Sequence, residues 1–228
     1  SVYSLILMCA ILWIIKHRPM PSFQTKGSGA LTQLRNNHDY LVYCITLAFV
    51  YSAFILFQQK APDFFANILH VPQQNYAFIY AIAASPYLLS TMAVKKLIQR
   101  YPIAQIVRIG SFLLASGYTL MSCASFIQHH WLSEILGWTG ILISMTGTGA
   151  VMPCSKIGAI TSVNSHVGTA SSGMKFIQIG SSIGAAWCAA TLMATVGPAS
   201  SLSLLALCGI MAAWINRRSA VIPFHPHQ

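Results

Sequence analysis

The sequence predicts an all-α, polytopic membrane protein, a helix bundle with about seven transmembrane helices. Of its 228 residues, 55% are hydrophobic and only 7% are charged, which is the balance of a membrane protein and not of a soluble domain. The apolar residues gather in seven stretches, most of them close to the roughly 20 residues that a helix needs to cross about 30 Å of hydrocarbon. Basic residues gather in every second connection between these stretches. These three observations predict the fold class.

The first apolar stretch, residues 2–15, is short and begins with Ser in place of Met. No small-residue cleavage site precedes the basic residues that follow it, so a signal peptide is a poor explanation. We expect residues 1–18 to be the end of a transmembrane helix whose beginning is missing, which would make the chain a fragment. A complete protein with a short first helix is the alternative. Residues 19–38 contain Pro, Gly and Ser and predict a central cytoplasmic linker.

Six apolar stretches follow at short intervals, at residues 40–58, 76–94, 106–127, 135–152, 169–192 and 200–215. They predict a six-helix unit over residues 39–217, followed by a cytoplasmic tail over residues 218–228. Residues 60–74 are expected to form the longest connection on the outer side. Pro86 lies inside one predicted helix and should kink it, because proline removes a backbone donor.

Glycines predict close helix contacts in two of these stretches. Gly137, Gly140, Gly147 and Gly149 indicate a closely packed or bendable helix over residues 135–152. Gly180 and Gly184 give the next helix a small-xxx-small spacing, which in membranes allows two backbones to approach. We expect these glycines to serve helix packing.

The basic residues predict the orientation of the chain. One set of connections holds almost all of them (Lys16, Arg18, Lys26, Arg35, Lys95, Lys96, Arg100, Arg108, Lys156, Arg217 and Arg218), whereas the alternate connections hold Lys60. Because short cytoplasmic loops retain positive charge, we expect the C-terminus to be cytoplasmic. Topology thus explains the net charge of +10. No nucleic-acid partner is expected, because that needs clustered basic residues on a folded polar domain.

Lys175 lies inside a predicted helix, among apolar, small or weakly polar residues. An ammonium group in hydrocarbon costs about 2.5–3.5 kcal/mol on insertion scales, so it normally faces a partner or a watery cavity. Ser171, Lys175, Gln178 and Ser182 recur every three or four residues and share one helix stripe. The stripe predicts either the wall of a wet substrate cavity or a lysine that snorkels to the headgroups. Gln178 cannot reach as far, and its donors need partners in lipid.

Aromatic and amide side chains suggest further walls of the same cavity. Tyr51, Phe54 and Gln58 share a face of one predicted helix, and Tyr76, Tyr80 and Tyr87 roughly share a face of the next. Such walls suit amphipathic organic molecules. Core packing or anchoring at the membrane interface is the alternative role for each tyrosine.

Two segments resemble the C-terminal half of a major facilitator superfamily transporter. Residues 95–102 (Lys-Lys-Leu-Ile-Gln-Arg-Tyr-Pro), continuing to Arg108-Ile109-Gly110, are similar to the basic loop that repeats the family's cytoplasmic gating motif. Gly168-Thr169-Ala170-Ser171, followed by Phe176-Ile177-Gln178, resembles the opening of the family's eleventh helix. Within the superfamily the chain resembles the drug:proton antiporter group that includes the Bcr/CflA drug-resistance proteins. Residues 1–18 would then correspond to the end of the family's sixth helix.

The resemblance implies a function and two sets of residues. A six-helix half would rock against a missing N-terminal half around a site near the midplane, exporting small organic or drug-like molecules across the bacterial inner membrane in exchange for protons. The implied cavity residues are Tyr51, Phe54, Gln58, Tyr80, Met145, Lys175 and Gln178. The implied cytoplasmic gate is Lys95, Lys96, Arg100 and Arg108.

Two other classes of function remain as alternatives. The chain could be a non-transporting remnant or an assembly partner, since half a transporter lacks one wall of the cavity. A seven-helix receptor or photoreceptor is less favoured, because its lysine would lie in the last helix with a carboxylate counter-ion nearby. No enzyme is expected, because no nucleophile, base and orienting acid converge. No cofactor or metal is expected either, since the six cysteines show no CxxC spacing.

Overall fold

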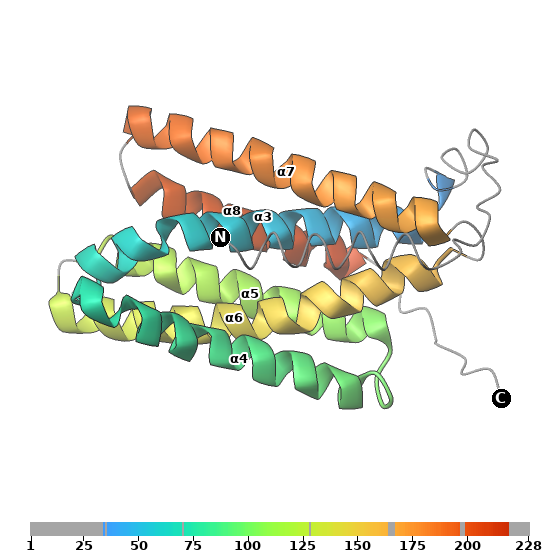
Figure 1. The fold of residues 1–228 in the computed structure, drawn as a ribbon, viewed down its shortest axis with the longest axis horizontal. Coiled ribbons are helices and arrows are strands. Elements are labelled where there is room, and N and C mark those ends of the chain that lie inside the picture. Colours follow the sequence, from blue (N-terminus) through green and yellow to red (C-terminus); the bar gives the residue numbers. More distant parts are fainter. Residues whose placement is uncertain are drawn as a thin grey trace, which may run out of the picture.

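The computed structural model describes residues 34, 36–69, 71–127, 129–163, 167–196 and 199–218. Within these ranges the chain forms long helices that run back and forth along one axis (Figure 1). They are α3 (His38–Asn67), η1 (Gln73–Asn75), α4 (Tyr76–Leu97), α5 (Ile103–Ala124), α6 (His130–Thr161), α7 (Val167–Val196) and α8 (Ala199–Arg218). No strand occurs in the described ranges, so the predicted all-α fold is confirmed.

The helices are those of an integral membrane protein. Among the described residues, five helices, α3 to α7, are long and apolar enough to cross a membrane, and α8 contains a shorter apolar helix over Leu202–Arg217. The partial helix predicted at residues 1–18 and the linker up to residue 33 lie outside the described residues, as does the tail after residue 218. The total of seven helices therefore stays a prediction.

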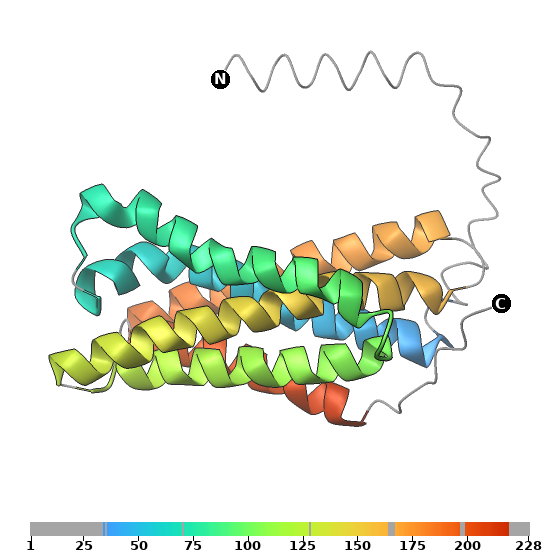
Figure 2. The same ribbon diagram turned by 90° about the horizontal axis from the view of Figure 1, so that it is seen from below.

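The six helices pack in two rows. In the first row α4 contacts α6, α6 contacts α3, and α3 contacts α7. In the second row α5 packs on α6 and α8, and α8 packs on α3 and α7. Figure 2 shows α5 and α8 on one side of the bundle and α4 on the other. The first row has one side that faces the second row and one side that faces away from it. We call the side that faces away the open face, and on α3 it carries Tyr51, Phe54 and Gln58.

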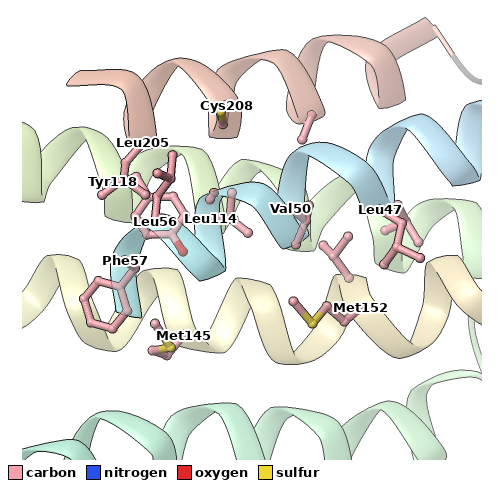
Figure 3. Packing of buried hydrophobic residues seen from close by; sticks show 14 of the residues in the cluster. Leu47, Val50, Leu56, Phe57, Leu114, Tyr118, Met145, Met152, Leu205 and Cys208 are labelled. Carbon is pink, nitrogen blue, oxygen red and sulfur yellow. The ribbon is translucent and has the colours of Figure 1, made fainter. Parts of the chain in front are cut away.

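A hydrophobic core joins the two rows. Figure 3 shows Leu56 of α3 beside Leu114 of α5 and Leu205 of α8, with Val50 further along α3, and all four are almost fully buried. Burial is uneven between helices: 56% of the apolar window of α3, α5 and α6 is buried, but only 17% of that of α4 and α7. The two outer helices of the first row therefore expose most of their surface to whatever surrounds the bundle.

Four glycines bring α5 and α6 into backbone contact. A Cβ on Gly117 would lie 2.7 Å from the carbonyl oxygen of Gly140, and a Cβ on Gly147 would lie 2.6 Å from that of Gly110. The glycines are seven residues apart on each helix, so two antiparallel backbones meet twice. The prediction that residues 135–152 form a closely packed helix is confirmed.

Prolines inside helices leave backbone carbonyl groups without a backbone donor, and hydroxyl side chains donate hydrogen bonds to these carbonyls. Pro86 cannot bond the carbonyl of Ile82, and the hydroxyl of Ser85 donates to that oxygen at 2.8 Å. Pro153 likewise frees the carbonyl of Gly149, and the hydroxyl of Thr91 on α4 shares its proton between this oxygen at 3.1 Å and the carbonyl of Tyr87 at 2.9 Å. In a bilayer such local donors allow proline to stay inside a helix. The second bond also links α4 to α6.

The predicted loop over residues 60–74 is wrong in its first half. α3 continues to Asn67, with Pro62 inside the helix. The helix continues because the side chains that follow the proline pack into the hydrophobic core. Phe64 and Phe65 are buried, and the ring of Phe64 would lie 3.2 Å from a Cβ on Gly137. Burial of two aromatic rings offsets the backbone bond that proline removes.

Candidate functional site

The polar stripe of α7 follows the edge where this helix meets α3. Gln178 is 1% exposed and Ser182 is 8% exposed, whereas Ser171 is half-buried and Lys175 is exposed. Since the four residues lie within about 60° around the helix at 100° per residue, the stripe begins on the surface and enters the protein toward mid-membrane.

Three contacts fix α7 beside α3 with the two helices parallel. The hydroxyl of Tyr40 donates to the carbonyl of Ala170 at 2.7 Å, and the hydroxyls of Ser52 and Ser181 are 3.2 Å apart. Nearer the other end, Nζ of Lys60 contacts Sδ of Met193. This register places Gln178 level with residues 47–51 of α3, where Tyr51 points to the open face.

Gln178 is the unusual member of the stripe. Its side chain is buried, yet neither Nε2 nor Oε1 has a hydrogen-bond partner among the described residues. A buried amide without a hydrogen bond costs about 1–3 kcal/mol by protein mutational data. A buried amide without a hydrogen bond needs a polar partner to offset this cost. Gln178 lies about one helical turn after Lys175.

A second lysine approaches Lys175 from α6. Lys156 is half-buried, and its charge interacts electrostatically with that of Lys175. Within the described residues no ion pair joins either lysine to a carboxylate. The two cations therefore create a positive field at one end of the stripe, where an anion would be attracted.

The predicted aromatic wall forms on α3 but only in part on α4. Tyr51 and Phe54 are half-buried and Gln58 is exposed, and all three lie on the same face of α3. The ring of Phe54 stacks on that of Tyr87, with centroids 6.2 Å apart. α3 and α4 thus share one aromatic surface.

Two other predicted cavity residues lie in packed surroundings. The ring of Tyr80 meets that of Phe65 edge-on, with centroids 5.2 Å apart. Met145 is 3% exposed and belongs to the hydrophobic core. The structure thus gathers Tyr51, Phe54 and Gln58 on one face and holds Tyr80 and Met145 against the core.

The four predicted gate residues cluster where α4 turns into α5. Lys95 and Lys96 occupy the last turn of α4, where positive charge favours the helix dipole. Arg100 lies in the turn and Arg108 lies in the second turn of α5, and all four side chains are exposed. Lys156 and Arg217 lie at the same end of the bundle, which we call the basic end.

The opposite end of the bundle carries two acidic side chains, Asp63 and Glu134. Lys60 and Asp63 are 3.9 Å apart, and Glu134 lies 3.5 Å from His130. The charge asymmetry read from the sequence is therefore an asymmetry between the two ends of the folded bundle.

Sequence reasoning missed a buried polar cluster near the basic end. The amide nitrogen of Asn216 on α8 lies 3.1 Å from the hydroxyl of Thr46 on α3 and 3.2 Å from that of Ser111 on α5. All three residues are buried. An asparagine inside an apolar stretch was the available signal, but its position beside Arg217 made it look like the end of the helix.

The prediction for Gly180 and Gly184 is wrong within the described chain. No atom of it lies within 4 Å of a Cβ built at either position. α7 packs instead through the other side of the helix, where Ala170, Met174 and Ala189 are buried. The glycine pair faces outward from the bundle.

Comparisons with known proteins assign no family to the chain. No protein-family model matches the sequence, and no curated protein matches it at a significant level.

Proposed function

We propose that this chain is the C-terminal half of a transporter of the major facilitator type, which moves small organic molecules across a membrane by alternating access. The support is physical: a six-helix unit in two rows, one end rich in basic residues, aromatic and amide side chains on the open face of α3, and an exposed ammonium group on the neighbouring α7. In transporters of this kind the substrate site lies between two such halves, near the midplane.

The outward faces of α4 and α7 support the need for a second half. Phe78 and Met92 of α4 are about 70% exposed, and Phe176 of α7 is 80% exposed. Gly180 and Gly184 leave room on α7 for another helix to approach closely. An N-terminal half would cover part of this surface, and lipid would cover the rest.

The assignment of the substrate site rests on the side-chain amide of Gln178, which is buried without a hydrogen-bond partner among the described residues. The amide is enclosed between helices, and opening of this edge during alternating access would bring it the water or polar cargo that hydrocarbon cannot supply. Lys175 lies beside it, within reach of the same face. Tyr51, Phe54 and Gln58 would hold the apolar and aromatic parts of the cargo, as in other sites for organic ligands.

Lys175 acts in this proposal as an element of charge selectivity and not as the proton carrier. A proton carrier must titrate inside the pathway, and the usual acidic carrier of such families belongs to the other half. The basic end would face the bacterial cytoplasm by the positive-inside rule, with Lys95, Lys96, Arg100 and Arg108 at the cytoplasmic gate. Drug efflux coupled to protons is the activity proposed.

Accumulation of fluorescent probes in cells producing the protein tests the proposal. We expect lower retention of an aromatic organic probe in producing cells than in cells with an empty vector, and recovery of retention when a protonophore collapses the proton gradient. Lys175→Ala should shift the preference between anionic and cationic probes, while Lys175→Arg keeps it. Gln178→Leu should weaken export of both.

Lys60→Ala is the matched control, because Lys60 lies on α3 near the opposite end and contacts Met193. It should leave probe preference unchanged. If Lys175→Ala and Lys175→Arg both keep the wild-type preference, the selectivity role is wrong. If producing cells retain probes as vector cells do, despite membrane insertion, transport itself is contradicted.

A further inference from the structure

A groove on the outside of the bundle, away from the open face, lies between α5 and α8. It has a volume of about 350 Å³, and it opens on the second row, opposite to the proposed substrate face. We propose that this groove binds an anionic phospholipid of the leaflet at the basic end, with the acyl chain along the groove and the phosphate at its arginine end.

The α5 wall of the groove offers an apolar track. It consists of Phe112, Ala115, Ser116 and Thr119, which recur every three or four residues and so share one face of the helix. The hydroxyl of Ser116 donates to the carbonyl of Leu113 at 2.9 Å, and that of Thr119 donates to the carbonyl of Ala115 at 2.9 Å. Because both hydroxyls are bonded within the helix, the wall suits a hydrocarbon chain.

The α8 wall has the same character and ends in a cation. It consists of Ile210, Ala213, Trp214 and Arg217, again at helical spacing. Ile210 and Trp214 are each about half exposed, whereas Ala213 is buried. The small residue forms the floor and the large ones form the rim. Arg217 is exposed, so its guanidinium can meet a phosphate at the surface.

A second arginine lies at the same level on the other wall. Asn216 contacts Ser111 at 3.2 Å, which sets Arg217 level with the turn of α5 that holds Arg108. Arg108 is exposed and lies one helical turn before Phe112, on the same side of α5. Arg217 therefore lines the end of the groove, and Arg108 lies one helical turn beyond its α5 lining.

The groove and the arginine beyond it together match one leaflet. From Phe112 to Thr119 the lining of the groove rises about 10 Å at 1.5 Å per residue, and Arg108 lies about 6 Å further along the helix. Half of the hydrocarbon layer is about 15 Å thick. A phosphate held at the arginines would place an acyl chain along the whole groove. Basic pockets between transmembrane helices are known sites for anionic headgroups. The two arginines should therefore favour any anionic phospholipid over a neutral one.

Quenching of Trp214 fluorescence by brominated lipids tests the site. The full chain is reconstituted with brominated phosphatidylglycerol or brominated phosphatidylcholine, and the signal of Trp214 is taken as the difference from Trp214→Phe. We expect the anionic lipid to be preferred. Arg108→Gln and Arg217→Gln should each lower that preference about fivefold, the factor that corresponds to about 1 kcal/mol per basic residue near the surface.

Arg100→Gln is the matched control, since this arginine is exposed at the same end but lies in the turn before α5 and not on the helix face that lines the groove. It should leave the preference unchanged. Ser116→Phe, at an exposed position on the groove wall, should fill the groove and abolish the preference while circular dichroism shows an unchanged helix content.

Three results would overturn the proposal. Equal quenching by the two lipids would show that no headgroup is selected. An effect of Arg100→Gln as large as that of Arg217→Gln would indicate a general surface potential. Displacement of the lipid by soluble glycerol phosphate would indicate a small-anion site in which the acyl chain plays no part.

Discussion

Replacing Gly117 with alanine should lower the stability of the protein by about 1–3 kcal/mol, the usual cost of adding atoms to a packed interior. A Cβ at this position would lie 2.4 Å from the backbone nitrogen of Ser144 and 2.7 Å from the carbonyl oxygen of Gly140. Both atoms belong to the backbone of α6. The clash can therefore be relieved only if α5 and α6 move apart, and this movement would also loosen the contact between Gly110 and Gly147.

Gly180→Ala is the matched control for this substitution. No atom of the described chain lies within 4 Å of a Cβ there, and alanine favours a helix interior over glycine by about 0.5–1 kcal/mol. Unfolding by sodium dodecyl sulfate in mixed micelles, followed by circular dichroism, compares the two variants. We expect Gly180→Ala to be at least as stable as the wild type. Wild-type stability of Gly117→Ala, or an equal loss in both variants, would refute the packing argument.

Three further predictions follow from the polar contacts and the charge asymmetry. Asn216→Leu should cost about 1 kcal/mol in the same titration, since interhelical hydrogen bonds in membranes average about 0.6 kcal/mol each; an unchanged midpoint would contradict the buried cluster. Thr91→Val should cost about 0.6 kcal/mol, because the carbonyl of Gly149 loses its donor; no loss would show that this bond carries little weight. A cysteine in place of Gln99 should be labelled from the cytoplasmic side of intact vesicles and one in place of Gln74 from the other side, and the reverse pattern would invert the proposed orientation.

The membrane fold could be predicted from the sequence because two of its causes are local. Apolar length decides which segments are long enough to cross the bilayer, and the basic residues of short connections mark one end of the bundle; the sidedness that they imply stays a prediction. The end of α3 could not be predicted in this way. Pro62 signals a break, and only the burial of Phe64 and Phe65 against other helices keeps the helix intact.

Residue spacing predicted helix faces and close contacts with mixed success. The period of the α7 stripe correctly placed Gln178 and Lys175 on one side of the helix, although it did not show that the amide is buried and the ammonium exposed. Small-residue spacing predicted the α6 contact correctly and the contact of Gly180 wrongly. Spacing indicates that a close approach is possible, whereas the presence of a neighbour depends on how the whole bundle assembles.

The central claim is that the polar stripe of α7 meets water at Lys175, where it reaches the surface, while the neighbouring apolar side of the helix does not. Lys175 and Phe176 are adjacent in the sequence, and both are exposed. They point about 100° apart around the helix, so they lie on different sides of α7 at nearly the same depth in the membrane. In a variant without the six native cysteines, Lys175→Cys and Phe176→Cys can be treated with a membrane-impermeant thiol reagent added at the basic end. The account predicts that the first reacts and the second does not. Equal reaction of both, or reaction of neither, would contradict it.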